Sequence, residues 1–169
     1  SCRKRRTTSI PIRLDYRWLD LRKPKNLLIF KIWTDMEAAM REYWLSHGFI
    51  QIHTPKFVAG ATESGAELFS LDYFGKRASL AQSHQFYKQM AMAAGFERVF
   101  EVGPVFRAEP SFTSRHATEF TGYDMEISFI DSYYEIIDEE ERMINYGLQR
   151  IKGTYGEEIK KMFDREIVI

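Results

Sequence analysis

The chain has 169 residues, of which 44% are hydrophobic and 15% aromatic, a composition that predicts one folded domain and is not typical of a disordered chain. Lys and Arg together number 24, as do Asp and Glu, so the charge balance does not indicate a nucleic-acid binder, although it leaves room for a local basic patch. The single cysteine, Cys2, excludes a disulfide within the chain and suits a reducing compartment, so we expect a cytoplasmic protein. No apolar run approaches the roughly 20 residues of a membrane span, and no membrane partner is expected.

The first 25 residues are charged and irregular, and we expect a linker there, ahead of the main domain at 26–169. Residues 3–6 are basic, and we interpret them as a solvated tail, with an arm that touches RNA phosphates as the alternative. Asn26 is a good helix N-cap and Gly48 is typical of a helix end, so a helix is predicted from Asn26 to about His47. Its apolar residues recur at helical spacing: Leu27, Phe30, Trp33, Met40, Tyr43 and Trp44.

Extended segments and a loop follow this helix. Residues 49–57 should be extended, with Pro55 at a sheet edge or a bulge because proline donates no ladder hydrogen bond. Small and polar residues make 59–67 a predicted loop. Two further elements are then expected, a hairpin of 68–74 and 77–81 and a helix over 84–94.

A long antiparallel hairpin is predicted next, with strands near 97–106 and 119–130 and a polar loop between them. Asp124 and Glu126 lie two positions apart on the second strand, so they share a face opposite Tyr123 and Met125. Such a pattern is unusual unless the acids line a site. A helix over 133–152 and a short strand at 167–169 complete the prediction, which is an α+β fold with an antiparallel sheet flanked by helices.

Four blocks of the sequence follow one another in a familiar order. They are Tyr16-Arg17-Trp18-Leu19-Asp20-Leu21-Arg22, then the helix with Gly48-Phe49-Ile50 and Thr54-Pro55-Lys56, then AQSHQFYKQ at 81–89, and then Phe106-Arg107-Ala108-Glu109 with Arg115-His116 and Glu119-Phe120. Together they resemble the class II aspartyl-tRNA synthetases of the archaeal and eukaryotic type, over about residues 11–168. The second block resembles motif 1 and the fourth resembles motif 2. Motif 3 and the anticodon-binding domain have no counterpart, so we expect part of a catalytic domain, incomplete at its C-terminus.

The resemblance implies an aspartate–tRNA ligase, which activates aspartate with ATP to aspartyl-adenylate and then transfers it to the 3′ end of tRNA. Negative charge develops at the α-phosphate in the first step, and the arginine fork matches phosphate oxygens bidentately. Arg107 is therefore the expected catalytic residue, against the alternative of a surface arginine paired with Glu109. The expected cofactors are ATP and Mg²⁺, whose ligands should lie mostly outside this chain, and no metal ligand is assigned within it.

Further contacts with ATP are implied by the motif 2 resemblance. Glu109 should meet adenine or the terminal base of tRNA, and His116 or Arg115 should meet the γ-phosphate. Phe120 should stack on adenine, although an isolated phenylalanine on a strand would more often be a core residue.

The aspartate pocket is implied by the third block and by the acids of the second long strand. Lys88 should supply the cation for the side-chain carboxylate of aspartate, whereas the asparaginyl relatives lack this lysine; the alternative is a solvated lysine on an exposed helix face. Gln85 lies three positions before Lys88 and shares its helix face. The remaining residues of the implied pocket are Glu63, Gln82, Asp124 and Glu126.

Two departures and several alternatives accompany the resemblance. His84 stands where the family often has proline, and Pro110 follows Glu109 in the loop. The alternatives are an asparaginyl-tRNA synthetase, a synthetase-like paralogue that activates an amino acid without charging tRNA, and a purely structural interaction domain. Expected partners are aspartate, ATP, tRNA and a second copy of the chain, with Pro55 near the two-fold axis of a homodimer.

Overall fold

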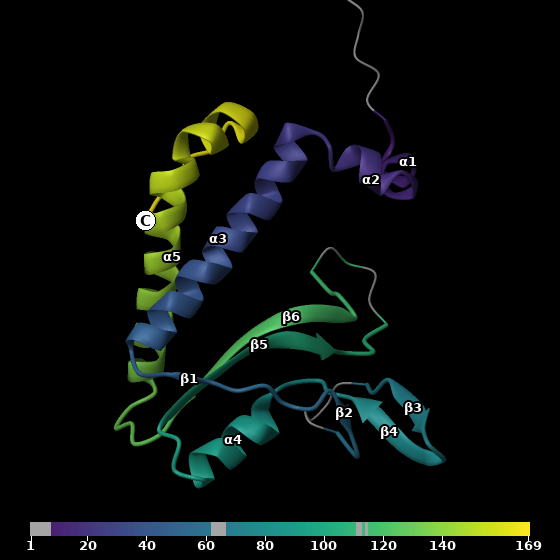
Figure 1. Cartoon of the computed structure of the whole chain (residues 1–169), viewed down its shortest axis with the longest axis vertical. Coiled ribbons are helices and arrows are strands. Elements are labelled where there is room, and N and C mark those ends of the chain that lie inside the picture. Colours follow the sequence, from purple (N-terminus) through teal and green to yellow (C-terminus); the bar gives the residue numbers. More distant parts are fainter. Residues whose placement is uncertain (1–7, 62–66, 111–112, 114) are drawn as a thin grey trace, which may run out of the picture. The chain divides into compact units, whose positions relative to one another are not determined.

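The computed structural model describes residues 8–61, 67–110, 113 and 115–169. The chain divides into two compact units, one formed by Ser1–Tyr43 with Glu140–Ile169 and the other by Trp44–Glu139 (Figure 1). The boundary expected after residue 25 stays a prediction.

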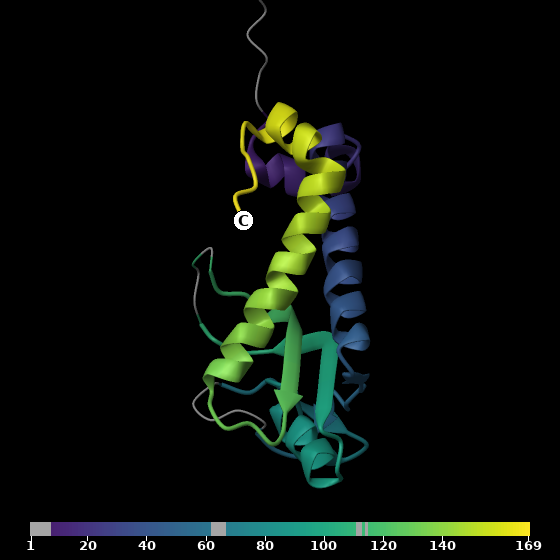
Figure 2. The same cartoon turned by 90° about the vertical axis from the view of Figure 1, so that its left-hand side faces the viewer.

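The first unit is helical. Its main elements are α3 (Pro24–Ser46) and α5 (Tyr134–Phe163), which lie side by side in this unit in both views (Figures 1 and 2). Gly147 of α5 faces Met36 of α3 so closely that a Cβ atom on the glycine would come within 2.6 Å of the Met36 sulfur. Glu42 of α3 accepts hydrogen bonds from Tyr146 at 2.8 Å and from Arg150 at 2.6 Å. The Met36 side chain packed on the Gly147 backbone and the polar cross-links from Glu42 therefore join the two helices.

Residues 10–20, expected to be irregular, form two short helices instead, α1 (Ile10–Asp15) and α2 (Arg17–Asp20). The reason is a cluster around the buried Asp20 carboxylate. It accepts hydrogen bonds from Arg13 at 2.9 Å, Arg17 at 2.9 Å, Lys23 at 2.7 Å and Asn26 at 2.9 Å. These bonds hold the pKa of Asp20 far below its usual range, with the bonds from Arg13 and Lys23 outweighing burial.

Two other expectations for this unit were wrong. The predicted helix over 133–152 continues to Phe163, through Gly153 and Gly156, where helix propensity is poor. The predicted strand at 167–169 is not a strand: after Asp164, which has a positive φ of 54°, the described chain runs back without regular structure.

The second unit contains two small sheets. The first has the order β1 (Ile50–Gln51), β5 (Arg98–Phe106) and β6 (Glu119–Ile127), with β5 and β6 antiparallel as predicted. Its short edge strand β1 runs parallel to β5, which the expected antiparallel sheet did not include. The second sheet has the order β2 (Phe57–Val58), β4 (Lys76–Leu80) and β3 (Ser70–Tyr73) and is antiparallel throughout. The predicted hairpin is therefore confirmed, with its turn at Phe74-Gly75, both at positive φ.

The two faces of the β5–β6 pair differ in character. On one face, Phe100 and Tyr123 pack on Trp44, with ring centroids 4.8 and 5.9 Å from it. On the other face, Glu101 lies opposite Asp124 and Gly103 lies opposite Gly122, and helix α4 (Gln85–Ala93) covers this side. The predicted separation of the acids from Tyr123 is confirmed. The polar face, which carries the acids, is the candidate location of the functional site.

Candidate functional site

Lys88 of α4 is buried against β6, with 4% of its surface exposed. Its ammonium group donates a hydrogen bond of 3.0 Å to the backbone carbonyl of Met125 and lies 3.4 Å from a carboxylate oxygen of Glu126. A buried ammonium needs such partners because its desolvation is costly. The alternative of a solvated lysine on an exposed helix face is therefore wrong.

Gln85 and Gln82 lie on either side of the start of α4. The Gln85 amide donates to Glu126 at 3.2 Å, so Gln85 and Lys88 reach the same carboxylate from one helix face, as their spacing predicted. Gln82 has no exposed surface, and its amide lies 3.5 Å from the carbonyl oxygen of Glu67. Gln85, Lys88 and Glu126, three of the residues implied for the aspartate pocket, thus form one cluster.

Arg107 begins the loop that follows β5. Its backbone N–H donates to the carbonyl of Thr118 at 3.0 Å, which closes the base of the loop onto β6. Its guanidinium donates to the backbone carbonyl of Gln82 at 3.4 Å and lies over the Phe120 ring, 5.4 Å from the ring centroid. This contact joins the residue expected at the phosphate to the residue expected at adenine.

The loop residues predicted to contact ATP are more exposed than Lys88 and Gln82. His116 and Glu109 form a partly exposed ion-pair contact of 3.9 Å, whose strength depends on protonation of the imidazole. Among the described residues, Glu109 makes this contact with His116 and none with Arg107, so the alternative of an Arg107–Glu109 surface pair does not hold. Arg115 is exposed and its backbone N–H donates to Thr113 at 3.3 Å. Glu63, predicted for the aspartate pocket, lies outside the described residues.

A buried network continues from the pocket toward the segment around Pro55, which is itself exposed. The imidazole of His84 has no exposed surface and its Nδ1 lies 2.9 Å from Asp124. On its other side, Glu101 accepts hydrogen bonds of 2.6 Å from the Lys56 ammonium and 3.0 Å from the Thr54 backbone. Asp124 was predicted from the sequence as a site residue, whereas Glu101 and Lys56 were not. The available signal for Glu101 was its place as an acid at the centre of the largely apolar strand β5.

Neighbouring cations stabilise the ionised form of both acids. The pKa of Asp124 is held below its ordinary value first by its contact with His84 and then by the charges of Lys88 and Arg107, against the opposing effect of burial. Burial raises the pKa of Glu101, but the hydrogen bonds from Lys56 and Thr54 and the charge of His84 together outweigh it, so the net shift is downward. Both carboxyl groups therefore favour their ionised form more strongly than free carboxyl groups do.

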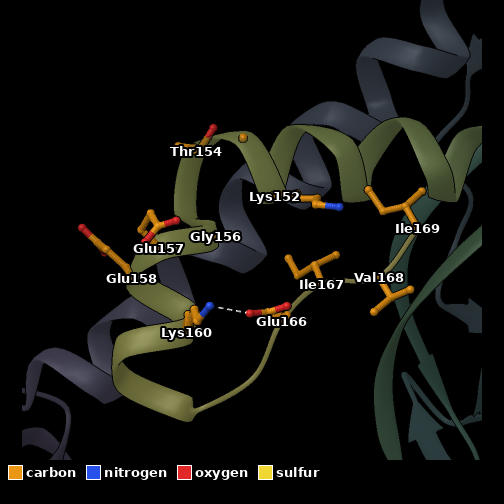
Figure 3. A pocket seen from close by; sticks show the side chains of 11 residues that line it. Lys152, Thr154, Gly156, Glu157, Glu158, Lys160, Glu166, Ile167, Val168 and Ile169 are labelled. Atoms are coloured by element: carbon orange, nitrogen blue, oxygen red, sulfur yellow. Dashed lines mark ion pairs between the residues drawn. The ribbon is translucent and has the colours of Figure 1, made fainter.

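A separate hollow lies in the helical unit (Figure 3). It has a volume of about 630 Å³ and is lined by the second half of α5 and by residues 166–169, with an ion pair of 2.6 Å between Lys160 and Glu166. None of the residues predicted from the sequence for ATP or aspartate lines it. Its lining offers exposed charges and no buried polar group that calls for a ligand.

Within residues 8–61, 67–110, 113 and 115–169, no group of His, Cys, Asp or Glu is arranged to hold a metal ion. None of the helices in the described part of the chain is long and apolar enough to cross a bilayer.

Comparison with known proteins assigns the family. Residues 9–167 match the family model of class II tRNA synthetases (D, K and N). The chain belongs to this family. The matched residues of this class II synthetase chain cover nearly its whole length, and they include Glu126 with its neighbours, Arg107 and Phe120.

Individual relatives agree with this assignment. The chain is 48% identical over 161 residues to the aspartate–tRNA(Asp/Asn) ligase of Aeropyrum pernix, a match that covers 91% of this chain and 36% of that protein. It is 49% identical over 150 residues to the aspartate–tRNA(Asp) ligase of Pyrococcus horikoshii, covering 89% of this chain and 34% of that protein. The class II chain thus spans about a third of the length of these relatives.

Solved structures show the same fold. A putative aspartyl-tRNA synthetase from Leishmania major superimposes with a TM-score of 0.87 at 36% identity, covering 96% of this chain and 31% of that one. An asparaginyl-tRNA synthetase from Pyrococcus horikoshii, complexed with asparaginyl-adenylate, gives a TM-score of 0.85 at 40% identity over 91% of this chain and 35% of that one. The predicted α+β synthetase fold is confirmed.

Proposed function

We propose that the protein carrying this chain is an aspartate–tRNA ligase, which forms aspartyl-adenylate from aspartate and ATP and then esterifies the 3′ end of tRNA. The observation that carries the proposal is the buried ammonium of Lys88, placed between α4 and β6 beside two carboxylates. A fixed cation in this position matches the side-chain carboxylate of aspartate. The similarity to aspartate–tRNA ligases of archaea supports the same substrate.

Lys88 retains donor capacity for a substrate. Its contacts within the chain are the Met125 carbonyl and the Glu126 carboxylate, at 3.0 and 3.4 Å, and an ammonium group can donate to a further acceptor. The side-chain carboxylate of a bound aspartate would be this further acceptor, and it would compensate the Lys88 ammonium group for the water it loses on burial. An asparagine amide would leave the lysine without a full countercharge, which disfavours it.

The amino-acid pocket is assigned to the neighbours of Lys88. Gln85 and Glu126, already hydrogen-bonded to each other, would orient the substrate, and Asp124 would face its ammonium group. Gln82 and Glu63 complete the proposed set, Glu63 from the loop outside the described residues.

The nucleotide is assigned to the β5–β6 end of the same face. Arg107 would hold the α-phosphate and the attacking carboxylate together, offsetting the charge that develops as pyrophosphate leaves. Phe120, directly beneath the guanidinium, would stack on adenine. Glu109 would meet adenine or the terminal base of tRNA, and Arg115 or His116 would meet the γ-phosphate.

Several further features belong to the proposal. Mg²⁺ would be held chiefly by the phosphate oxygens of ATP, since the described residues offer no metal-binding group. The exposed Pro55 would lie at the interface of a homodimer, and the protein would act in the cytoplasm. The relative from Arabidopsis thaliana that is 54% identical over 126 residues is described as cytoplasmic.

A second candidate is asparagine activation, which the similarity to the asparaginyl-tRNA synthetase of Pyrococcus horikoshii favours. The buried Lys88 argues against it, because the side-chain amide of asparagine offers no carboxylate to the remaining donor capacity of this ammonium group. The two candidates differ in one measurable property, the amino acid that supports exchange.

The test is ATP–pyrophosphate exchange without tRNA, measured on the full-length protein that carries this chain, with aspartate or asparagine. We expect exchange with aspartate, and its loss in Arg107→Ala and in Lys88→Ala. Arg77→Ala, which removes an exposed arginine of β4, is the matched control and should retain exchange. Exchange with asparagine alone would favour the second candidate, and a folded protein without exchange for any amino acid would refute both.

A further inference from the structure

His84 occupies a space made by two glycines. Gly103 and Gly122 lie opposite each other on β5 and β6, on the face covered by α4. A Cβ atom at Gly122 would come within 3.4 Å of His84 Cε1, and one at Gly103 within 3.7 Å of His84 Nε2. The imidazole therefore packs close to a part of the sheet that carries no side chains, where even a Cβ atom would be in van der Waals contact with it.

The imidazole also separates two carboxylates. Glu101 and Asp124 are directly opposite each other on the same face of the β5–β6 pair, an arrangement that is unfavourable for like charges. His84 Nδ1 lies 2.9 Å from Asp124, and His84 Nε2 lies 4.0 Å from Glu101. A ring nitrogen thus faces each acid, at the place where the cross-strand repulsion would otherwise be greatest.

The two acids differ in what else holds them. Glu101 is almost fully buried and is engaged by Lys56 and the Thr54 backbone. Asp124 has 35% of its side chain exposed, and His84 is the group at hydrogen-bond length from it. Its other charged neighbours, Lys88 and Arg107, act on it through the electric field alone. His84 is therefore the contact that decides the direction of the Asp124 carboxylate.

The contact is short but not a regular hydrogen bond. The Nδ1–Oδ2 distance of 2.9 Å is suitable, yet within the described structure neither imidazole nitrogen has a partner in the direction of its N–H. A change in the relative orientation of the ring and the Asp124 carboxylate would align the two groups. The pair thus has room to tighten when another group approaches Asp124 from the exposed side.

We propose that His84 is a positioning residue of the amino-acid site, which holds the Asp124 carboxylate toward the ammonium group of the bound amino acid. The inference rests on the proposed function for its substrate. His84 itself touches no substrate, because its side chain has no exposed surface. Its effect is on the affinity for the amino acid, while ATP binding, at Arg107 and Phe120, is independent of it.

Two amide variants separate the roles of the two ring nitrogens. The amide of asparagine imitates Nδ1 of histidine, which faces Asp124, and the amide of glutamine imitates Nε2, which faces Glu101. In the full-length protein, His84→Gln should raise KM for aspartate about tenfold, as expected for loss of a hydrogen bond to a charged group. His84→Asn should restore KM to within about threefold of the wild type, with kcat and KM for ATP little changed in both.

The same variants show which outcome contradicts the inference. A merely structural role would make Asn and Gln equivalent and would alter KM for ATP as well. Equal KM values for aspartate in wild type, His84→Gln and His84→Asn would overturn the proposal while leaving aspartate activation intact.

A thermal-unfolding cycle tests the pairing without activity. His84→Gln and Asp124→Asn should shift the unfolding midpoint non-additively, and more so than His84→Gln combined with Glu101→Gln. If the wild type shows no exchange with aspartate, the proposed function fails, and this cycle alone decides whether His84 holds Asp124. Additive shifts would then overturn the pairing.

Discussion

The ammonium group of Lys88 lies 3.4 Å from the Glu126 carboxylate, with 5% of the lysine side chain and 24% of the glutamate side chain exposed. One partner is therefore sealed inside the unit while the other reaches its edge. A pair of this kind contributes to stability and at the same time leaves its acid within reach of a ligand.

Lys88→Met should lower the free energy of unfolding by about 1–3 kcal/mol, because it leaves Glu126 and the Met125 carbonyl without their buried donor. Urea unfolding at neutral pH measures the effect. Lys76→Met, at an exposed position of β4, is the control and should change the stability by less than about 0.5 kcal/mol. Equal losses for the two variants would contradict the pairing.

Phe120→Leu should raise KM for ATP about tenfold, since stacking on a base is worth roughly 1–3 kcal/mol and leucine offers no ring. Phe120→Tyr keeps the ring and should stay within about threefold of the wild type, in the same pyrophosphate exchange assay. Phe129→Leu, which changes a ring that is 88% exposed on the segment after β6, serves as control. An unchanged KM in Phe120→Leu would place adenine elsewhere.

Asp20→Asn should destabilise the protein at neutral pH, and this effect should shrink as the pH falls below about 4. The pKa of Asp20 is lowered in the folded state by its bonds to Arg13 and Lys23, so its stabilising contribution is present above the ordinary aspartate pKa of about 3.9. The contribution is lost as the pH falls below that value, toward the folded-state pKa. Thermal unfolding of both proteins between neutral and acid pH measures the convergence. A difference that persists unchanged into acid would exclude the charge as its cause.

Gly147→Ala tests the close approach of α5 to α3. Alanine favours a helix over glycine by about 1 kcal/mol, but its Cβ would meet the end of the flexible Met36 side chain at 2.6 Å. In a Met36→Ala background that obstacle is removed, and Gly147→Ala should then be more stabilising by about 1 kcal/mol than in the wild type. Urea unfolding of the four proteins gives the difference. Additive effects would show that the two helices do not touch there.

The sequence predicted the elements whose signals are local. The hairpin of β3 and β4, the β5–β6 pair and the shared face of Asp124 and Glu126 follow from turn chemistry and from the two-residue repeat of strands, although the hairpin turn lies one residue earlier than expected. The helices α1 and α2 did not, because Asp20 holds them together through residues up to seven positions away. The helix propensities of individual residues do not include such side-chain bonds between separate segments.

The buried part of the site was equally hard to predict. That Glu101 lies opposite Asp124 depends on the register of β5 and β6, and that His84 enters between them depends on where α4 begins. Lys56 reaches Glu101 from a segment 45 positions earlier. Only residues matched to known motifs could be assigned in advance, and His84, which departs from the motif, was recognised as different without a role.

The alternation of side chains along β6 makes the length of this strand as important as its composition. A single-residue insertion between Gly122 and Glu126 would exchange the two faces, carrying the acids toward Trp44 and the aromatic or aliphatic side chains of Tyr123 and Met125 toward α4. Such an insertion would disrupt both the aromatic packing on Trp44 and the acidic face beside α4, even though no residue of the strand had been replaced. Natural length variation in this hairpin is therefore expected to be confined to the connection between Arg107 and Thr118, where the backbone bond between these residues closes the loop.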